Sequence, residues 1–174
     1  MIKFEAVQVI GIYICPEKGQ PMEEVPRVRA IPGLGLKGDR YALGTGTFSG
    51  VHNLGKPGQY MRQVTFMSNL QLHLGNLALI RMGKKTFEPW HTRRNIFLRG
   101  NTDLNLADLV GKEFVCGNVR FRGFEEAPPC TVPTKVHGEL GFEEAFRGFG
   151  GLRAEILTDG YICSGDDGHV PVKS

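Results

Sequence analysis

Residues 152–163 read LRAEILTDGYIC, and this stretch indicates the fold most directly. Its first half alternates apolar and polar residues, which is typical of a strand that buries one face. Asp159-Gly160 follows, a dipeptide that favours a two-residue hairpin turn, and residues 161–163 begin a second apolar run. We therefore expect an antiparallel hairpin, with residues 152–157 paired to residues 161–163.

Similar patterns lie on either side of this stretch. Residues 113–124 predict another hairpin, with Gly117-Asn118 at its turn, and residues 3–14, 25–30 and 63–66 are rich in strand-forming side chains. Ser68 and Gln71 form a capping-box pair ahead of apolar residues at helical spacing, and Gly83 suits the end of that helix. Residues 142–149 predict a second helix. About eight short strands joined by turns favour a barrel over alternating strands and helices.

Composition supports a compact, β-dominated chain. Glycine (24) and proline (10) make up roughly a fifth of the 174 residues, against about an eighth in average proteins. The hydrophobic share of 41% excludes intrinsic disorder. No apolar run approaches the ~20 residues of a membrane span, and no export signal is evident. The four cysteines are far apart in the sequence, so we expect free thiols, a cytoplasmic protein and one domain over residues 1–174.

Two basic segments are candidates for binding an anion. In residues 35–40 (GLKGDR), glycines and cations can surround an anion, although a tight turn closed by an Asp39–Arg40 bridge explains the same residues equally well. Arg93 and Arg94 are adjacent, so an extended segment would direct one toward a pocket and the other into solvent. The planar fork of arginine suits phosphate, whereas a solvated surface pair is the commoner case.

Cys130 has the sequence context of a reactive thiol. It lies in a proline-rich loop, APPCT at residues 127–131, with Lys135 and His137 close behind. Loop placement and cationic neighbours favour the reactive thiolate form. The other three cysteines fall in apolar strand patterns, where cysteine is usually a small buried hydrophobe. Spacing alone leaves a purely structural role open for Cys130 as well.

Taken in order, eight short motifs resemble the MOSC domain, the module named after the C-terminal part of molybdenum cofactor sulfurases. They are GLKGDRY (35–41), GTGTFSG (44–50), RQVT (62–65), RRNI (93–96), DLNLADL (103–109) before Val110-Gly111, Pro129-Cys130, GGLRAEIL (150–157) and GYICSGD (160–166). Each motif alone is weak, but eight in this order are specific. They extend over nearly the whole chain and are most similar to small stand-alone members of the family.

The resemblance implies an all-β dominated MOSC-type β-barrel with a few short peripheral helices. It also implies a pocket for the molybdenum cofactor (molybdopterin) and a cysteine that carries sulfur as a persulfide or ligates molybdenum. On this chain the resemblance implies that this cysteine is Cys130. A thiolate suits either role, because it is both a soft metal ligand and the nucleophile that accepts a sulfane sulfur. The implied cofactor-binding residues are Lys37, Asp39, Arg40, Arg62, Arg93, Arg94, Asn95 and Arg153.

The chain departs from the family pattern at two points. Close relatives often carry C-x-x-C at the cysteine loop, but here the first position is Ala127, so no resolving disulfide partner is present there. The His-Gly-Gly motif of some bacterial relatives is also missing, which puts their reductase activity in doubt for this chain. We expect no pyridoxal phosphate on this chain alone.

Three functions follow as hypotheses. The first is a sulfur carrier or cofactor-handling protein acting through Cys130, with a sulfur donor such as a cysteine desulfurase as its partner. The second is a molybdenum-dependent reductase of N-hydroxylated compounds, with an electron-transfer partner. The third is a non-catalytic barrel that binds anions or nucleic acid, suggested by the basic residues between Arg81 and Arg99. A net charge of +3 and the lack of interleaved aromatics disfavour nucleic acid, and we expect no membrane partner.

Overall fold

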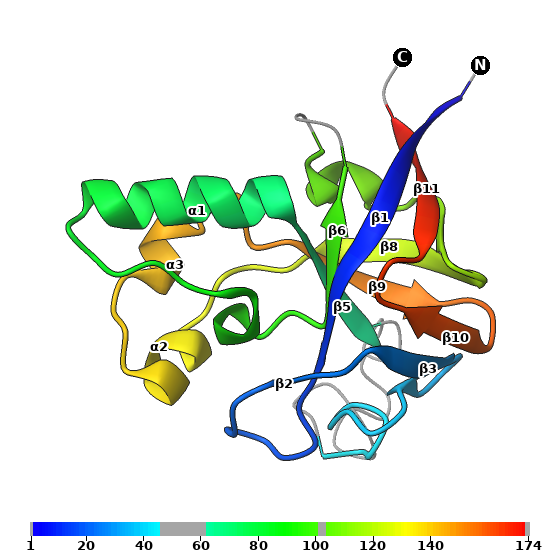
Figure 1. The fold of residues 1–174 in the computed structure, drawn as a ribbon, viewed down its shortest axis with the longest axis horizontal. Helices are drawn as coiled ribbons and strands as arrows, with labels where there is room; N and C mark the ends of the chain where they lie inside the picture. Colours follow the sequence, from blue (N-terminus) through cyan, green and yellow to red (C-terminus); the bar gives the residue numbers. More distant parts are fainter. Residues whose placement is uncertain (1, 46–61, 101–103, 173–174) are drawn as a thin grey trace.

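The computed structural model of the chain describes residues 2–45, 62–100 and 104–172. Figure 1 shows a body of strands with the α-helices gathered on one side. The strands are β1 (Lys3–Ile14), β2 (Glu23–Glu24), β3 (Arg27–Ile31), β4 (Gly35–Leu36), β5 (Val64–Ser68), β6 (Ile96–Arg99), β7 (Glu113–Cys116), β8 (Val119–Glu126), β9 (Leu152–Ile156), β10 (Gly160–Cys163) and β11 (Asp167–Val172). The helices are α1 (Asn69–Arg81), α2 (Val132–His137) and α3 (Phe142–Ala145), with short 3-10 helices η3 (Pro89–Thr92) and η4 (Leu106–Leu109).

Seven strands close into a barrel in the order β11-β7-β8-β9-β5-β6-β1. The ring is complete because β1 pairs with both β6 and β11. All neighbours are antiparallel except β5 and β6, which run parallel. A separate three-stranded sheet has the order β10-β3-β4. The expectation of a β-dominated barrel with a few short helices is therefore confirmed.

Aromatic side chains fill the centre of the barrel. Phe66 of β5 meets the rings of Phe114 and Phe121 edge-on, with centroids 5.2 and 5.0 Å apart, and all three side chains are buried. Burying each ring stabilises the fold by roughly 1.5–3 kcal/mol. The arginines that alternate with Phe121 on β8 point outward to Glu113. The predicted hairpin of residues 113–124 is present, because Cys116 pairs directly with Val119.

Helix α1 packs outside the barrel through a second apolar cluster. Ser68 caps it in the predicted box, in which its side chain accepts from the backbone N–H of Gln71. Gly75 lies in its middle, where a Cβ atom would stand 2.4 Å from the ring of Phe146. The glycine thus permits close contact with α3, which ends at Ala145 and is shorter than the predicted helix of residues 142–149. None of the described helices has the length and apolarity needed to cross a membrane.

The predicted pairing of residues 152–157 with 161–163 is wrong. Strand β9 pairs with β5 and β8, whereas β10 leaves the barrel and pairs with β3. Asp159 does not form the turn of a β9–β10 hairpin; its carboxylate accepts two hydrogen bonds from Arg29 on β3, at 2.9 and 2.8 Å. The Asp-Gly dipeptide marks a change of direction, and long-range pairing selects the partner strand. Residues 46–50 of the second motif and Asp103 of the fifth lie outside the described residues.

Candidate functional site

A cavity of about 560 Å³ lies beside the loop that carries Cys130. Separate segments build its wall: the turn after β1, the chain after β4, β5, the segment before β6, the Cys130 loop with α2, and β9. Its lining residues are Lys18, Gly19, Arg40, Tyr41, Thr65, Arg93, Arg94, Pro128, Cys130, Val132, Lys135, Val136 and Arg153. Six of these carry a positive charge and none carries a negative one, so the cavity is suited to an anion.

The structure brings five of the nine predicted site residues to this cavity. They are Arg40, Arg93, Arg94, Cys130 and Arg153. The other four do not line it: Lys37 is exposed, Asp39 and Asn95 are buried, and Arg62 is half-buried. The basic block of residues 81–99 is also divided, because Arg93 and Arg94 are buried while its other basic side chains are exposed.

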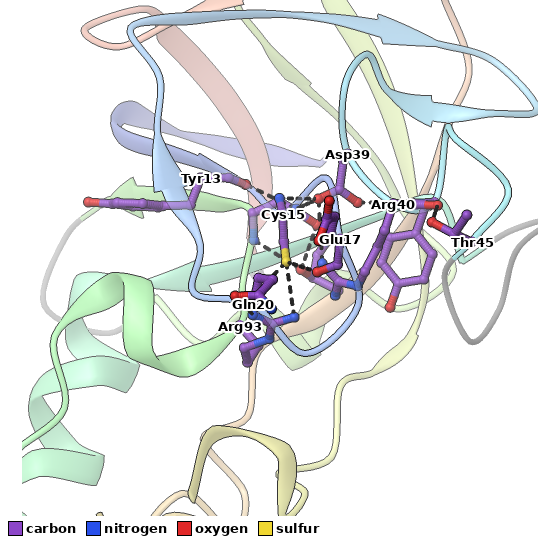
Figure 2. Close-up of polar contacts among 11 residues, drawn as sticks. Tyr13, Cys15, Glu17, Gln20, Asp39, Arg40, Thr45 and Arg93 are labelled. Atoms are coloured by element: carbon purple, nitrogen blue, oxygen red, sulfur yellow. Dashed lines mark hydrogen bonds and ion pairs between the residues drawn. The ribbon is translucent and has the colours of Figure 1, made fainter. Parts of the chain in front are cut away.

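Asp39 and Asn95 hold the wall of the cavity together. Oδ1 of Asp39 accepts from the backbone N–H of Cys15 at 2.8 Å and from Nδ2 of Asn95 at 3.3 Å. Oδ1 of Asn95 in turn accepts from both the backbone and the hydroxyl of Thr65, at 3.1 and 2.9 Å. Figure 2 shows Asp39 between Cys15 and Arg40, with Nη1 of Arg40 3.5 Å from the carboxylate. Both residues therefore position lining groups from behind the wall.

Glu125 binds two arginines, Arg153 of β9 and Arg62, which lies just before β5. Its Oε1 accepts from Nη1 of Arg153 at 2.7 Å, and its Oε2 accepts from Nη2 of Arg62 at 3.0 Å. Arg62 thus contributes to the site by orienting Glu125, which orients Arg153. Both ion pairs of Glu125 are partly exposed to solvent, so they contribute little to the free energy of unfolding and serve mainly to orient Arg153.

Arg93 has a left-handed backbone, with φ of 66°, which is the one positive φ among described residues other than glycine. Its side chain is 5% exposed; Nη1 donates to the carbonyl of Gln20, and Nη2 lies 3.3 Å from Sγ of Cys15 (Figure 2). Its Nε is buried without a hydrogen-bond partner. A strained backbone and an unsatisfied donor at a cavity wall are features of functional sites.

The prediction that Arg93 and Arg94 point to opposite sides is wrong. The left-handed turn at Arg93 prevents an extended segment, and both side chains are buried and line the cavity. Nε of Arg94 donates to the carbonyl of Gly150 at 2.6 Å, and Nη2 donates to those of Ala127 and Pro128 at 3.3 Å each. Burial lowers the pKa of Arg94 to about 10, so the guanidinium stays charged at neutral pH.

Cys130 is the exposed member of the four free thiols. Pro128 and Pro129 stiffen the chain before it, and α2 begins two residues later. Cys15 and Cys116 are buried, and burial together with Asp166 raises the pKa of Cys116 to about 12. Cys163 is intermediate in exposure. Exposure and its place in the cationic cavity therefore distinguish Cys130 from the other cysteines.

The sequence interpretation missed several lining residues and one histidine contact. Lys18 and Gly19 come from the turn after β1, which only the folded chain brings opposite α2. His91 of η3 packs against His137 at the end of α2, with ring centroids 4.3 Å apart. Nδ1 of His91 accepts from the backbone N–H of Glu88 at 3.0 Å, while Nε2 of His137 is buried without a partner. Desolvation lowers the pKa of both imidazoles.

Comparison with solved structures supports the fold. The YuaD protein from Bacillus subtilis is similar over 100% of both chains, with 20% identity and a TM-score of 0.76. YiiM from Geobacillus stearothermophilus is 17% identical over 96% of this chain and 75% of its own, with a TM-score of 0.63. YiiM from Escherichia coli is 12% identical over 99% and 71%, with a TM-score of 0.60. No protein-family model and no curated protein matches the chain.

These similarities show that the chain shares the fold of YuaD and YiiM, and its described strands close a seven-stranded barrel, which is consistent with the MOSC-like fold that the motifs imply. Identities of 12–20% show a shared fold alone, because proteins with the same fold can differ in function.

Proposed function

We propose that this chain is a stand-alone MOSC-type protein that carries sulfur as a persulfide on Cys130 for metal–sulfur cofactor assembly, that binds the molybdenum cofactor, or that does both. One observation carries the proposal: an exposed free thiol forms part of a cavity lined by six cationic side chains. Cations beside a thiol favour its thiolate, and the thiolate is the form that attacks sulfur and binds soft metals.

The sulfur-transfer step needs no external oxidant. Sγ of the Cys130 thiolate attacks the terminal sulfur of a donor persulfide, a new S–S bond forms, and the S–S bond of the donor breaks. The donor leaves as a thiolate, which takes up a proton from water. Lys135 of α2 lines the same cavity as the thiol, and its charge would offset the negative charge that the attacking and leaving sulfurs share.

The cavity also fits an anionic cofactor. The buried donor Nε of Arg93 has no partner within the described protein, and Arg40, Lys18 and Lys135 add charge around the same space. Arg93 and these cations would hold phosphate oxygens, and Cys130 would offer a soft ligand to the metal. When bound, molybdenum supplies two-electron redox chemistry, and the residues of this chain bind, orient and shield the group. That fit supports the alternative proposal of a molybdenum-dependent reductase of N-hydroxylated compounds.

Two measurements test these proposals. Incubation with a cysteine desulfurase and cysteine, followed by mass spectrometry, tests sulfur carriage on Cys130. Metal analysis of protein from a host that makes molybdenum cofactor tests the reductase proposal. Molybdenum retained by the wild type and lost in Cys130→Ala supports cofactor binding through the thiol, and no molybdenum in either protein rejects it.

A further inference from the structure

Most of the N–H donors of the Arg94 guanidinium bind backbone carbonyls. A guanidinium has five N–H donors. Nε donates to Gly150, both hydrogens of Nη2 are directed at Ala127 and Pro128, and Nη1 donates to the carbonyl of Thr92 at 3.3 Å. Four of five donors are therefore engaged, which leaves one for any ligand in the cavity.

Three of the four carbonyls that Arg94 binds belong to two segments beside Cys130. Ala127 and Pro128 lead directly into the thiol, and Gly150 leads into β9. The segments also contact each other, because the N–H of Ala127 donates to the carbonyl of Gly151 at 2.9 Å. A Cβ atom at Gly150 would stand 1.9 Å from the carbonyl oxygen of Ala127, so only glycine allows this approach. Arg94 thus joins the Cys130 loop to β9.

Burial makes these backbone contacts costly to lose. Arg94 is 6% exposed and shares the cavity wall with Arg40, Arg93 and Arg153, and burial lowers its pKa. Its hydrogen bonds to the carbonyls replace those that a solvated guanidinium makes to water, so displacing the loop would leave a buried charge without these partners.

We propose that Arg94 is a positioning residue for Cys130 rather than a ligand contact: it fixes the loop that leads into Cys130 against the start of β9, through the carbonyls of Ala127, Pro128 and Gly150. This rests on the proposed function only in taking Cys130 as the reacting group. Direct ligand contact then falls to Arg93, whose Nε is available.

The test measures alkylation of Cys130 by iodoacetamide in the full chain, followed by peptide mass spectrometry. Arg94→Lys and Arg94→Met both lose the planar fork that binds the carbonyls, but only Arg94→Met loses the charge. Positioning depends on the fork, so we expect both variants to slow alkylation of Cys130 by a similar factor, and amide hydrogen exchange of Cys130 to rise about tenfold in both.

Arg81→Met is the matched control, since it makes the same substitution at an exposed position and should leave the rate unchanged. If Arg94→Met does not fold, Arg94→Gln replaces it, because its amide still donates to one carbonyl without a charge. No slowing in either variant, or slowing in Arg94→Met alone, would overturn the proposal. A normal Arg94 effect without persulfide formation would instead reject sulfur carriage alone.

Discussion

Nη2 of Arg94 lies 3.3 Å from the carbonyl oxygen of Pro128, two residues before the exposed thiol of Cys130. This contact joins the segment before β6 to the loop that the sequence motifs single out. Arg94 lies two residues before β6 of the barrel, and Pro128 lies in the proline-rich loop. The position of Cys130 relative to the cationic cavity is therefore set by contacts within the fold.

The burial of the four thiols predicts their order of reaction. In native protein, a neutral alkylating reagent should modify Cys130 first and Cys163 more slowly. Cys15 and Cys116 are buried, so they should react at least about 100-fold more slowly, through local or global opening. Time-resolved peptide mass spectrometry measures the order, with Cys130→Ser as the control that removes the fast phase. Early modification of Cys15 would contradict the assignment of Cys130 as the accessible thiol.

Arg93 should supply the anion contact. Arg93→Gln removes the free Nε together with the fork, so inorganic phosphate should bind about tenfold more weakly than to wild type. The lost contacts to Gln20 and Cys15 should also destabilise the fold by about 1–3 kcal/mol. Calorimetric titration measures binding, and denaturant unfolding measures stability. Arg99→Gln, at an exposed position, serves as the control. Unchanged phosphate affinity in Arg93→Gln would remove Arg93 from the binding site.

The strands and the capped helix could be predicted because their signals are local. The strand-forming side chains of residues 3–14, the hairpin pattern of residues 113–124 and the Ser68–Gln71 box each depend on neighbours a few residues away. The partner of β10 could not be predicted in this way. Its Asp159 is bound by Arg29, 130 residues earlier in the chain, and no local pattern carries that information.

The candidate site divides in the same way. The motifs identified five residues that line the cavity, but they could not separate the lining from the supporting residues. Asp39, Arg62 and Asn95 belong to the same motifs, yet their partners are Cys15, Glu125 and Thr65, which only the folded chain places beside them. Lys18 and Gly19 reach the cavity through the turn after β1 and have no motif of their own.

Gly75 should resist substitution by alanine although it lies in a helix. Helix propensity alone would make Gly75→Ala stabilising by about 1 kcal/mol. The new Cβ would instead stand 2.4 Å from the ring of Phe146, and such overpacking costs about 1–3 kcal/mol. We expect a net loss of stability in denaturant unfolding, partly recovered in the double variant with Phe146→Leu. A stabilised Gly75→Ala would show that α1 and α3 do not pack as described.

The His91–His137 contact should make stability depend on pH. Desolvation lowers the pKa of both rings in the folded protein, and His137 is also close to Arg93. Above the ordinary histidine pKa of about 6.5, both rings are neutral in either state and the fold keeps its full stability. As pH falls below that value, the unfolded chain binds protons that the folded rings resist, so stability decreases.

Thermal unfolding between pH 7.5 and pH 5 measures this dependence. His137→Gln removes one titrating ring, so its midpoint should fall less steeply with decreasing pH than that of wild type. His73→Gln substitutes a histidine on α1 outside this contact and should keep the wild-type slope. Equal slopes in wild type and His137→Gln would mean that the ring pair does not couple folding to protons.

Mass spectrometry of Cys130 after exposure to a cysteine desulfurase and cysteine tests the proposed sulfur chemistry most directly. We expect a gain of about 32 Da, one sulfur atom, on the peptide that contains Cys130, reversed by a reducing thiol. Cys130→Ala should gain no sulfur, whereas Cys163→Ala should behave as wild type. No mass gain on Cys130, or a gain on Cys15 or Cys163 in its place, would contradict sulfur carriage by this thiol.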